Sequence, residues 1–100
     1  MYITVRGKRW KLLFEYLSKS LKCWGICDSP AHSAKRIRVH KALRGEHRLE
    51  IILHEIMHAA NWDLAEEAVA ETARDMARTL TRLGYSNESA AKDGQQTQAR

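Results

Sequence analysis

The residues of this sequence best suited to chemistry are two histidines and a glutamate within five consecutive positions. The segment His54-Glu55-Ile56-Met57-His58 has the pattern His-Glu-x-x-His. In an α-helix, side chains four positions apart lie on one face, so both imidazoles can point at a single Zn²⁺. The neighbouring Glu55 can then act as a general base toward a water molecule that the zinc activates. The pattern therefore indicates a zinc site suited to hydrolysis.

A catalytic zinc site needs a third protein ligand and one open coordination position. The acidic residues that follow the motif are Asp63, Glu66, Glu67 and Glu71. Glu66 shares a helical stripe with apolar residues further along the chain, whereas Glu67 shares its face with polar ones. A carboxylate on a core-facing stripe is costly without a partner, so we predict Glu66 as the third ligand. Glu67 is the alternative.

Two helices are expected to position these side chains. Apolar residues recur at spacings of three and four over residues 46–60, which predicts a helix that carries the motif. A second amphipathic segment predicts a helix over 64–83, with Asp63 as its N-cap and Gly84 as its C-cap. Because the connection over 61–63 is so short, the two helices must pack against each other.

The segment before the motif is expected to form a small β-region. Residues 2–6 alternate in polarity and precede a turn signal at 7–8, and residues 10–16 complete a hairpin, although their spacing also fits a helix. We expect a turn over 27–30 and a short strand over 37–40. The predicted fold class is therefore α+β, with a hairpin plus a short edge strand packed on two consecutive helices.

The chain of 100 residues has room for one domain. We predict this domain over 1–85 and a disordered tail over 86–100, where there is almost nothing to bury. No apolar stretch is long enough for a membrane span and the N-terminus lacks a signal-peptide pattern, so we expect no membrane association and a cytoplasmic location. Cys23 and Cys27 are then expected to be reduced thiols.

The chain is basic, with a formal net charge of +5 and 29% charged residues. This charge favours an acidic or phosphate-bearing partner. The cations gather in two segments, and they are Lys8, Arg9, Lys11, Lys35, Arg36, Arg38, Lys41 and Arg44. The competing hypothesis is thus a non-catalytic binding module for nucleic acid or protein, with a structural metal or none. Glu55 favours the enzyme, because a purely structural zinc site has no use for a general base.

The sequence HEIMHAANWDLAEEAV over 54–69, together with the ending Leu83-Gly84-Tyr85, resembles the small zincin-type metallopeptidases encoded by bacteriophages and prophages. It resembles minimal gluzincins less closely. The resemblance covers residues 2–85, and the His-Glu-x-x-His motif is its most specific part. It implies a short β-region with a turn over 25–30 and an edge strand over 37–39, followed by the motif helix and a glutamate-bearing helix.

The resemblance also implies a mechanism. His54 and His58 would bind Zn²⁺ with Glu66 as the third ligand, and Glu55 would be the general base in hydrolysis of a peptide bond. The substrate would be a peptide or protein, in the host cytoplasm if the chain is encoded by a phage. Zincins also use a His, Tyr or Arg to stabilise the oxyanion, and the sequence offers His32, His40, His47 and Tyr85 without distinguishing among them.

Overall fold

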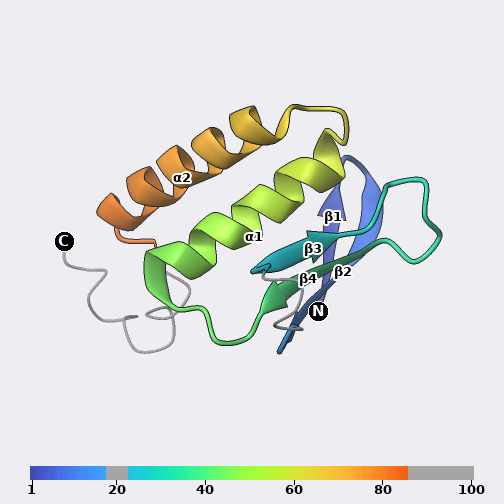
Figure 1. The fold of residues 1–100 in the computed structure, drawn as a ribbon, viewed down its shortest axis with the longest axis horizontal. Coiled ribbons are helices and arrows are strands. Elements are labelled where there is room, and N and C mark those ends of the chain that lie inside the picture. The colour runs from blue at the N-terminus through green and yellow to red at the C-terminus, as the bar shows by residue number, and fades with distance from the viewer. Residues whose placement is uncertain (18–22, 86–100) are drawn as a thin grey trace.

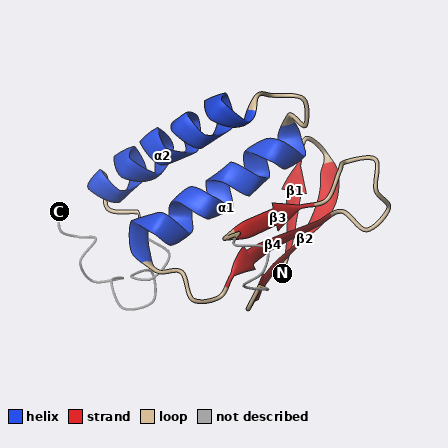
Figure 2. Cartoon of the chain, in the orientation of Figure 1, coloured by secondary structure: helices blue, strands red, loops and turns tan. Residues whose placement is uncertain are grey.

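A computed structural model describes residues 1–17 and 23–85 of the chain. Four strands are followed by two helices (Figures 1 and 2). The elements are β1 (Tyr2–Val5), β2 (Lys8–Glu15), β3 (Gly25–Cys27), β4 (Arg36–His40), α1 (Gly45–Ala60) and α2 (Glu66–Arg82). The segment 86–100, which the sequence predicts to be a disordered tail, lies outside the described residues. The α+β fold class predicted from the sequence is confirmed.

The four strands form one mixed sheet in the order β1-β2-β4-β3. Strands β1 and β2 are an antiparallel hairpin, β2 and β4 run parallel, and β4 and β3 run antiparallel. The hairpin turn places Arg6 at φ 49° and Gly7 at φ 79°. Two consecutive positive φ angles match the twist of the flanking strands, and glycine adopts such an angle without steric cost.

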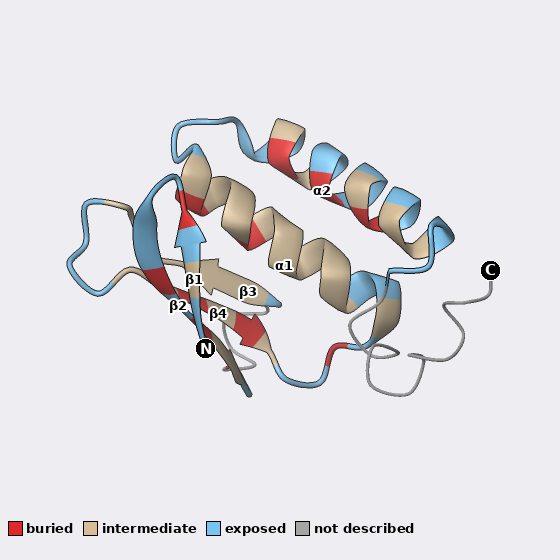
Figure 3. Ribbon diagram, turned by 180° about the vertical axis from the view of Figure 1, so that it is seen from behind, coloured by how far each residue is buried: buried red, intermediate tan, exposed pale blue. Residues whose placement is uncertain are grey.

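The elements stack in three layers, with α1 between the sheet and α2 (Figure 1). Alternate residues of the central strands point toward α1, and those with almost no exposed surface are Trp10, Ile37 and Val39. On its other side α1 packs against α2, whose buried residues Val69, Ala73 and Ala77 recur every fourth position (Figure 3). The small alanines on this stripe let the two helices approach closely.

The β-region differs from the prediction in two details. Residues 25–27 form strand β3, where the resemblance to zincin-type metallopeptidases implies part of a turn over 25–30. Because β3 pairs with β4, the strand predicted at the edge over 37–39 lies inside the sheet, and β3 takes the edge position. A three-residue strand that begins with glycine has almost no local signal, since its hydrogen bonds come from a partner distant in sequence.

The second helix begins at Glu66, two residues later than predicted, and Asp63 does not cap it. The backbone N–H of Leu64 donates to the carbonyl of Asn61 at 3.0 Å, which closes a turn between the helices. Ala65 then occupies the N-cap position with ψ 139° and without a side-chain hydrogen bond. Asp63, which the sequence predicts as the N-cap, therefore lies within this turn and not at the start of the helix.

Across the described residues, neither helix has the length and apolar character needed to cross a bilayer.

We expect Ile37→Ala to lower the free energy of unfolding by about 2–5 kcal/mol, because it opens a cavity beneath α1 at a side chain with 0% exposure. Leu83→Ala is the matched control, since that side chain is 67% exposed and should change stability by less than about 0.5 kcal/mol. Urea denaturation of both variants measures the difference. Equal effects of the two substitutions would contradict the layered core.

Candidate metal centre

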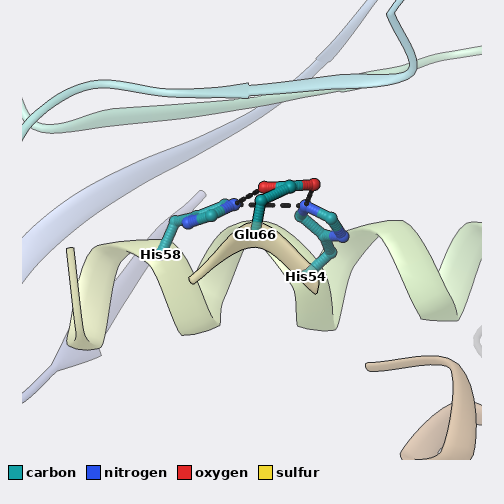
Figure 4. Close-up of side chains that lie close together, drawn as sticks. All are labelled: His54, His58 and Glu66. Atoms are coloured by element: carbon teal, nitrogen blue, oxygen red, sulfur yellow. Dashed lines mark hydrogen bonds and ion pairs between the residues drawn. The ribbon is translucent and has the colours of Figure 1, made fainter. Parts of the chain in front are cut away.

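Three side chains from α1 and α2 converge on one point (Figure 4). His54 and His58 lie one turn apart on the same face of α1, and their Nε2 atoms are 3.2 Å apart. Glu66, the first residue of α2, lies across both rings, with Oε1 2.8 Å from His58 Nε2 and Oε2 3.1 Å from His54 Nε2. The helix supplies the two imidazoles locally, and the turn between the helices brings the carboxylate to them.

This arrangement suits a cation. When both imidazoles are unprotonated at Nε2, their lone pairs and the Glu66 carboxylate meet at one point, and a metal ion bound there would remove the repulsion among them. The separations of 2.8–3.2 Å are close to the edge of about 3.3 Å expected for a tetrahedron of zinc ligands at their usual bond lengths. Within residues 1–17 and 23–85, these three residues form the group that could hold a metal ion.

The structure groups Glu66, and not Glu67, with the two histidines. The reasoning that led from the sequence to Glu66 is nevertheless wrong in one respect. Its side chain is 69% exposed, so it is not a carboxylate buried on a core-facing stripe. The imidazoles of His54 and His58 are only 15% and 18% exposed, and Glu66 covers them from the solvent side. The other two acidic candidates, Asp63 and Glu71, are exposed and lie outside the group.

Glu55 lies on the inner side of α1 and retains 7% of its surface exposure. Burial raises its pKa to about 7, and the negative charge of Glu66 adds to the rise. Burial also lowers the pKa of His54, which favours the neutral imidazole that a metal requires. The site thus combines a carboxyl group that can exchange a proton near neutral pH with imidazoles able to donate lone pairs.

Gly25 of β3 lies directly against Glu55. A Cβ atom added at Gly25 would be 2.7 Å from Glu55 Oε2 and 2.9 Å from Ile51 Cγ2, closer than real Cβ contacts. The absence of a side chain therefore lets the edge strand approach α1 and cover the Glu55 carboxyl group. This contact explains why Glu55 is buried on a helix next to two partly exposed histidines.

A pocket of about 660 Å³ contains the convergent side chains and Glu55. Its walls come from β3 and the segment before it, from α1, and from the turn between the helices; they are Cys23, Gly25, Ile26, Cys27, His54, Glu55, His58, Trp62 and Glu66. Sequence reasoning missed the part played by Trp62, whose ring centroid lies 6.3 Å from that of His58. Its exposed position in a short interhelical turn, four residues after His58, is the signal that could have identified it.

Cys27 lines the pocket as a protonated thiol. Burial raises its pKa to about 12, and the negative charges of Glu55 and Asp28 add to the effect. The thiol donates to the backbone carbonyl of Asp28 at 3.3 Å. Because a thiolate is the form that binds metals, this cysteine is a poor ligand in comparison with the imidazoles.

None of the four candidates for oxyanion stabilisation lines the pocket. The rings of His40 and His47 both contact Trp24, with centroid distances of 5.3 and 5.5 Å. His32 Nδ1 accepts a hydrogen bond from the backbone N–H of Ala34 in the loop before β4. The fourth candidate, Tyr85, is exposed after the end of α2.

Glu66→Gln should weaken zinc binding on the order of 10²-fold, because the substitution removes the charged ligand of the group. Glu67→Gln is the matched control, since it makes the same chemical change one residue along the helix and should leave the affinity unchanged. Competition with a chromophoric chelator measures both affinities. If Glu67→Gln alone loses the metal, the arrangement of α2 described above is wrong.

Gly25→Ala should lower the free energy of unfolding by about 1–3 kcal/mol, because the new methyl group overpacks the contact with Glu55. The cost should be smaller in a Glu55→Ala background, where part of the obstruction is gone. A double-mutant cycle by urea denaturation measures this coupling. Strict additivity of the two substitutions would argue against the contact.

Comparison of the chain with protein-family models, with curated proteins and with solved structures finds no match.

Proposed function

We propose that the protein is a zinc-dependent peptidase in which Glu55 is the general base. The observation that carries this proposal is a buried carboxyl group in the same pocket as two imidazoles and a carboxylate that converge on one point. Burying a carboxyl group is costly, and one with a pKa raised to about 7 is suited to accept and return a proton at neutral pH. A site that only held a metal would not need such a group.

The donor set favours zinc. Two imidazole nitrogens and one carboxylate are a set of ligands found in catalytic zinc sites, which keep a fourth position open. A zinc ion bound there would supply Lewis-acid activation of a water molecule and of a carbonyl oxygen. Structural zinc sites usually have four protein ligands, whereas the group here has three among the described residues. This difference favours the enzyme over the module with a structural metal.

The chain's own residues would then divide the work. His54 and His58 would hold the ion from one face of α1, and Glu66 would complete the ligand set from α2. Glu55 removes a proton from the attacking water and delivers it to the leaving amine. Trp62 and β3 form two of the walls of the pocket.

The position of β3 supports a peptide as the substrate. This strand is at the edge of the sheet and pairs only with β4 among the described strands. Its residue Gly25 lies against the Glu55 carboxyl group, and Ile26 and Cys27 line the pocket. An extended peptide that paired with the edge of β3 would carry its backbone carbonyls past the metal ligands. The resemblance to zincin-type metallopeptidases favours the same class of substrate.

Glu55→Gln should keep the metal and the fold but lower the rate of peptide cleavage by a factor on the order of 10² or more, because the amide cannot accept the proton. Glu71→Gln, the same change on the exposed surface of α2, is the matched control and should keep the rate. Zinc content and cleavage of a mixed peptide library are measured on both variants and on the unmodified protein.

Two outcomes would overturn the proposal. Cleavage that survives unchanged in the Glu55→Gln variant, and that a chelator removes and zinc restores, would assign the base to another group. A zinc-loaded unmodified protein that cleaves no member of the library would reject the peptidase in favour of the binding module.

A further inference from the structure

The sheet has a second face that the functional site does not use. Helix α1 packs on one side of the sheet, and no element of residues 1–17 and 23–85 lies over the other side, which we call the outer face (Figures 1 and 3). Strand register shows which residues share this face, because directly paired residues point the same way. Its members on β1, β2 and β4 are Tyr2, Thr4, Arg9, Lys11, Leu13, Glu15, Arg36, Arg38 and His40.

The outer face carries more positive than negative side chains. Two of the positive residues, Arg9 and Lys11, are consecutive outward positions of β2, and Arg36 and Arg38 are consecutive outward positions of β4. Lys11 pairs directly with Arg36 in the register. Like charges at opposite positions of neighbouring strands destabilise a sheet, so this arrangement has a cost that a bound anion would remove. Two carboxylates oppose the four positive charges: Asp28 forms an ion pair of 3.1 Å with Arg36, and Glu15 lies at the end of the same face.

An aromatic ring lies within this group of cations. The guanidinium of Arg9 is 3.9 Å from the centroid of the Tyr2 ring, and the ammonium of Lys11 is 6.0 Å from it. Tyr2 as a whole is 55% exposed, so the Arg9 guanidinium covers one side of the ring without burying the residue. Contact with the ring limits the motion of the two long side chains, which reduces the entropy lost when they bind an anion.

We propose that the outer face binds single-stranded nucleic acid. Alternate residues on a strand are about 6.6 Å apart and neighbouring strands are about 4.8 Å apart. Arg9, the Lys11–Arg36 pair and Arg38 therefore form a staggered row along the face, suited to successive phosphates of an extended backbone. An exposed aromatic ring beside these cations offers a surface on which a base can stack. The face consists of strands, and no helix projects from it to enter the groove of a duplex.

This surface is distinct from the metal centre. The ligands His54, His58 and Glu66 belong to the two helices, whereas the cations belong to strands and point away from α1. Nucleic-acid binding therefore requires neither the metal nor Glu55. A failure to find peptidase activity would therefore not count against nucleic-acid binding, and the converse also holds.

Fluorescence anisotropy with a labelled oligothymidylate of about 20 nucleotides tests the proposal on the full chain. If the face contacts three or four phosphates, a plot of the logarithm of the association constant against the logarithm of the salt concentration should have a slope of about −2 to −3. Arg9→Gln with Lys11→Gln should weaken binding at low salt by about tenfold and reduce the magnitude of the slope by about 1.4, because two contacts are lost. The matched control is Arg74→Gln with Arg78→Gln on the exposed side of α2, which removes the same amount of positive charge. This control should leave the affinity at low salt and the salt slope unchanged.

Substitutions at Tyr2 separate stacking from charge. Tyr2→Ala should weaken binding by about tenfold with an unchanged salt slope, and Tyr2→Phe should bind as the unmodified protein does. Thermal unfolding of each variant confirms that it is folded.

Three results would overturn the proposal. The α2 control could lose as much affinity as the Arg9 and Lys11 variant, which would make net charge the cause. A duplex of equal length could bind more tightly than the single strand. Polyglutamate could displace the oligonucleotide as well as unlabelled oligothymidylate does, which would make the face a general polyanion site.

Discussion

The close approach of β3 to α1 at Gly25 is the contact on which the site depends. Without a Cβ atom at this position, the edge strand lies against the Glu55 carboxyl group and Ile51. The contact buries Glu55, and burial is the main cause of its raised pKa. It also places β3 along the pocket that contains the metal-binding group. A larger side chain at this single position would separate the strand from the helix and expose the carboxyl group to water.

Helix α1 is constrained on both sides, and this is why a small chain can position four functional side chains. The sheet holds the inner side of the helix through fully buried residues such as Ile37 and Val39. Helix α2 holds the other side through Val69 and its neighbouring alanines. Because the turn between the helices is short and hydrogen-bonded, the first residue of α2 can reach only the last turns of α1. Those turns carry the two histidines.

The layering places the metal-binding group and the cations of the outer face on opposite sides of the sheet. The Glu66 carboxylate lies with the imidazoles on the helical side, where the three side chains form a site for a cation, and the buried Glu55 carboxyl group lies in the same pocket. The cations of β2 and β4 lie on the opposite side of the sheet. A sheet whose two faces differ so much can support one chemistry in the pocket and another kind of contact on its outer surface.

Local geometry by itself determined the part of the site that lies on one helix. A spacing of four residues brings His54 and His58 together in any α-helix, and the apolar periodicity around them identifies that helix. The α+β class was also predictable from local patterns. Apolar residues alternate with polar ones in the first part of the chain, as in strands, and recur at spacings of three and four in the second part, as in helices. The short strand β3 depended on pairing with a segment further along the chain, and the start of α2 depended on the turn that closes between Asn61 and Leu64.

The choice of Glu66 over Glu67 shows where prediction from the sequence pattern ends and where the tertiary structure is needed. The sequence favoured Glu66 because of an expected buried stripe, yet the side chain is exposed, and a tight turn places it over the histidines. Burial of Glu55 is likewise invisible in the sequence, because the residue that covers it is a glycine thirty positions earlier. Only the tertiary structure decided these features, since desolvation and ligand convergence depend on which distant groups meet in space.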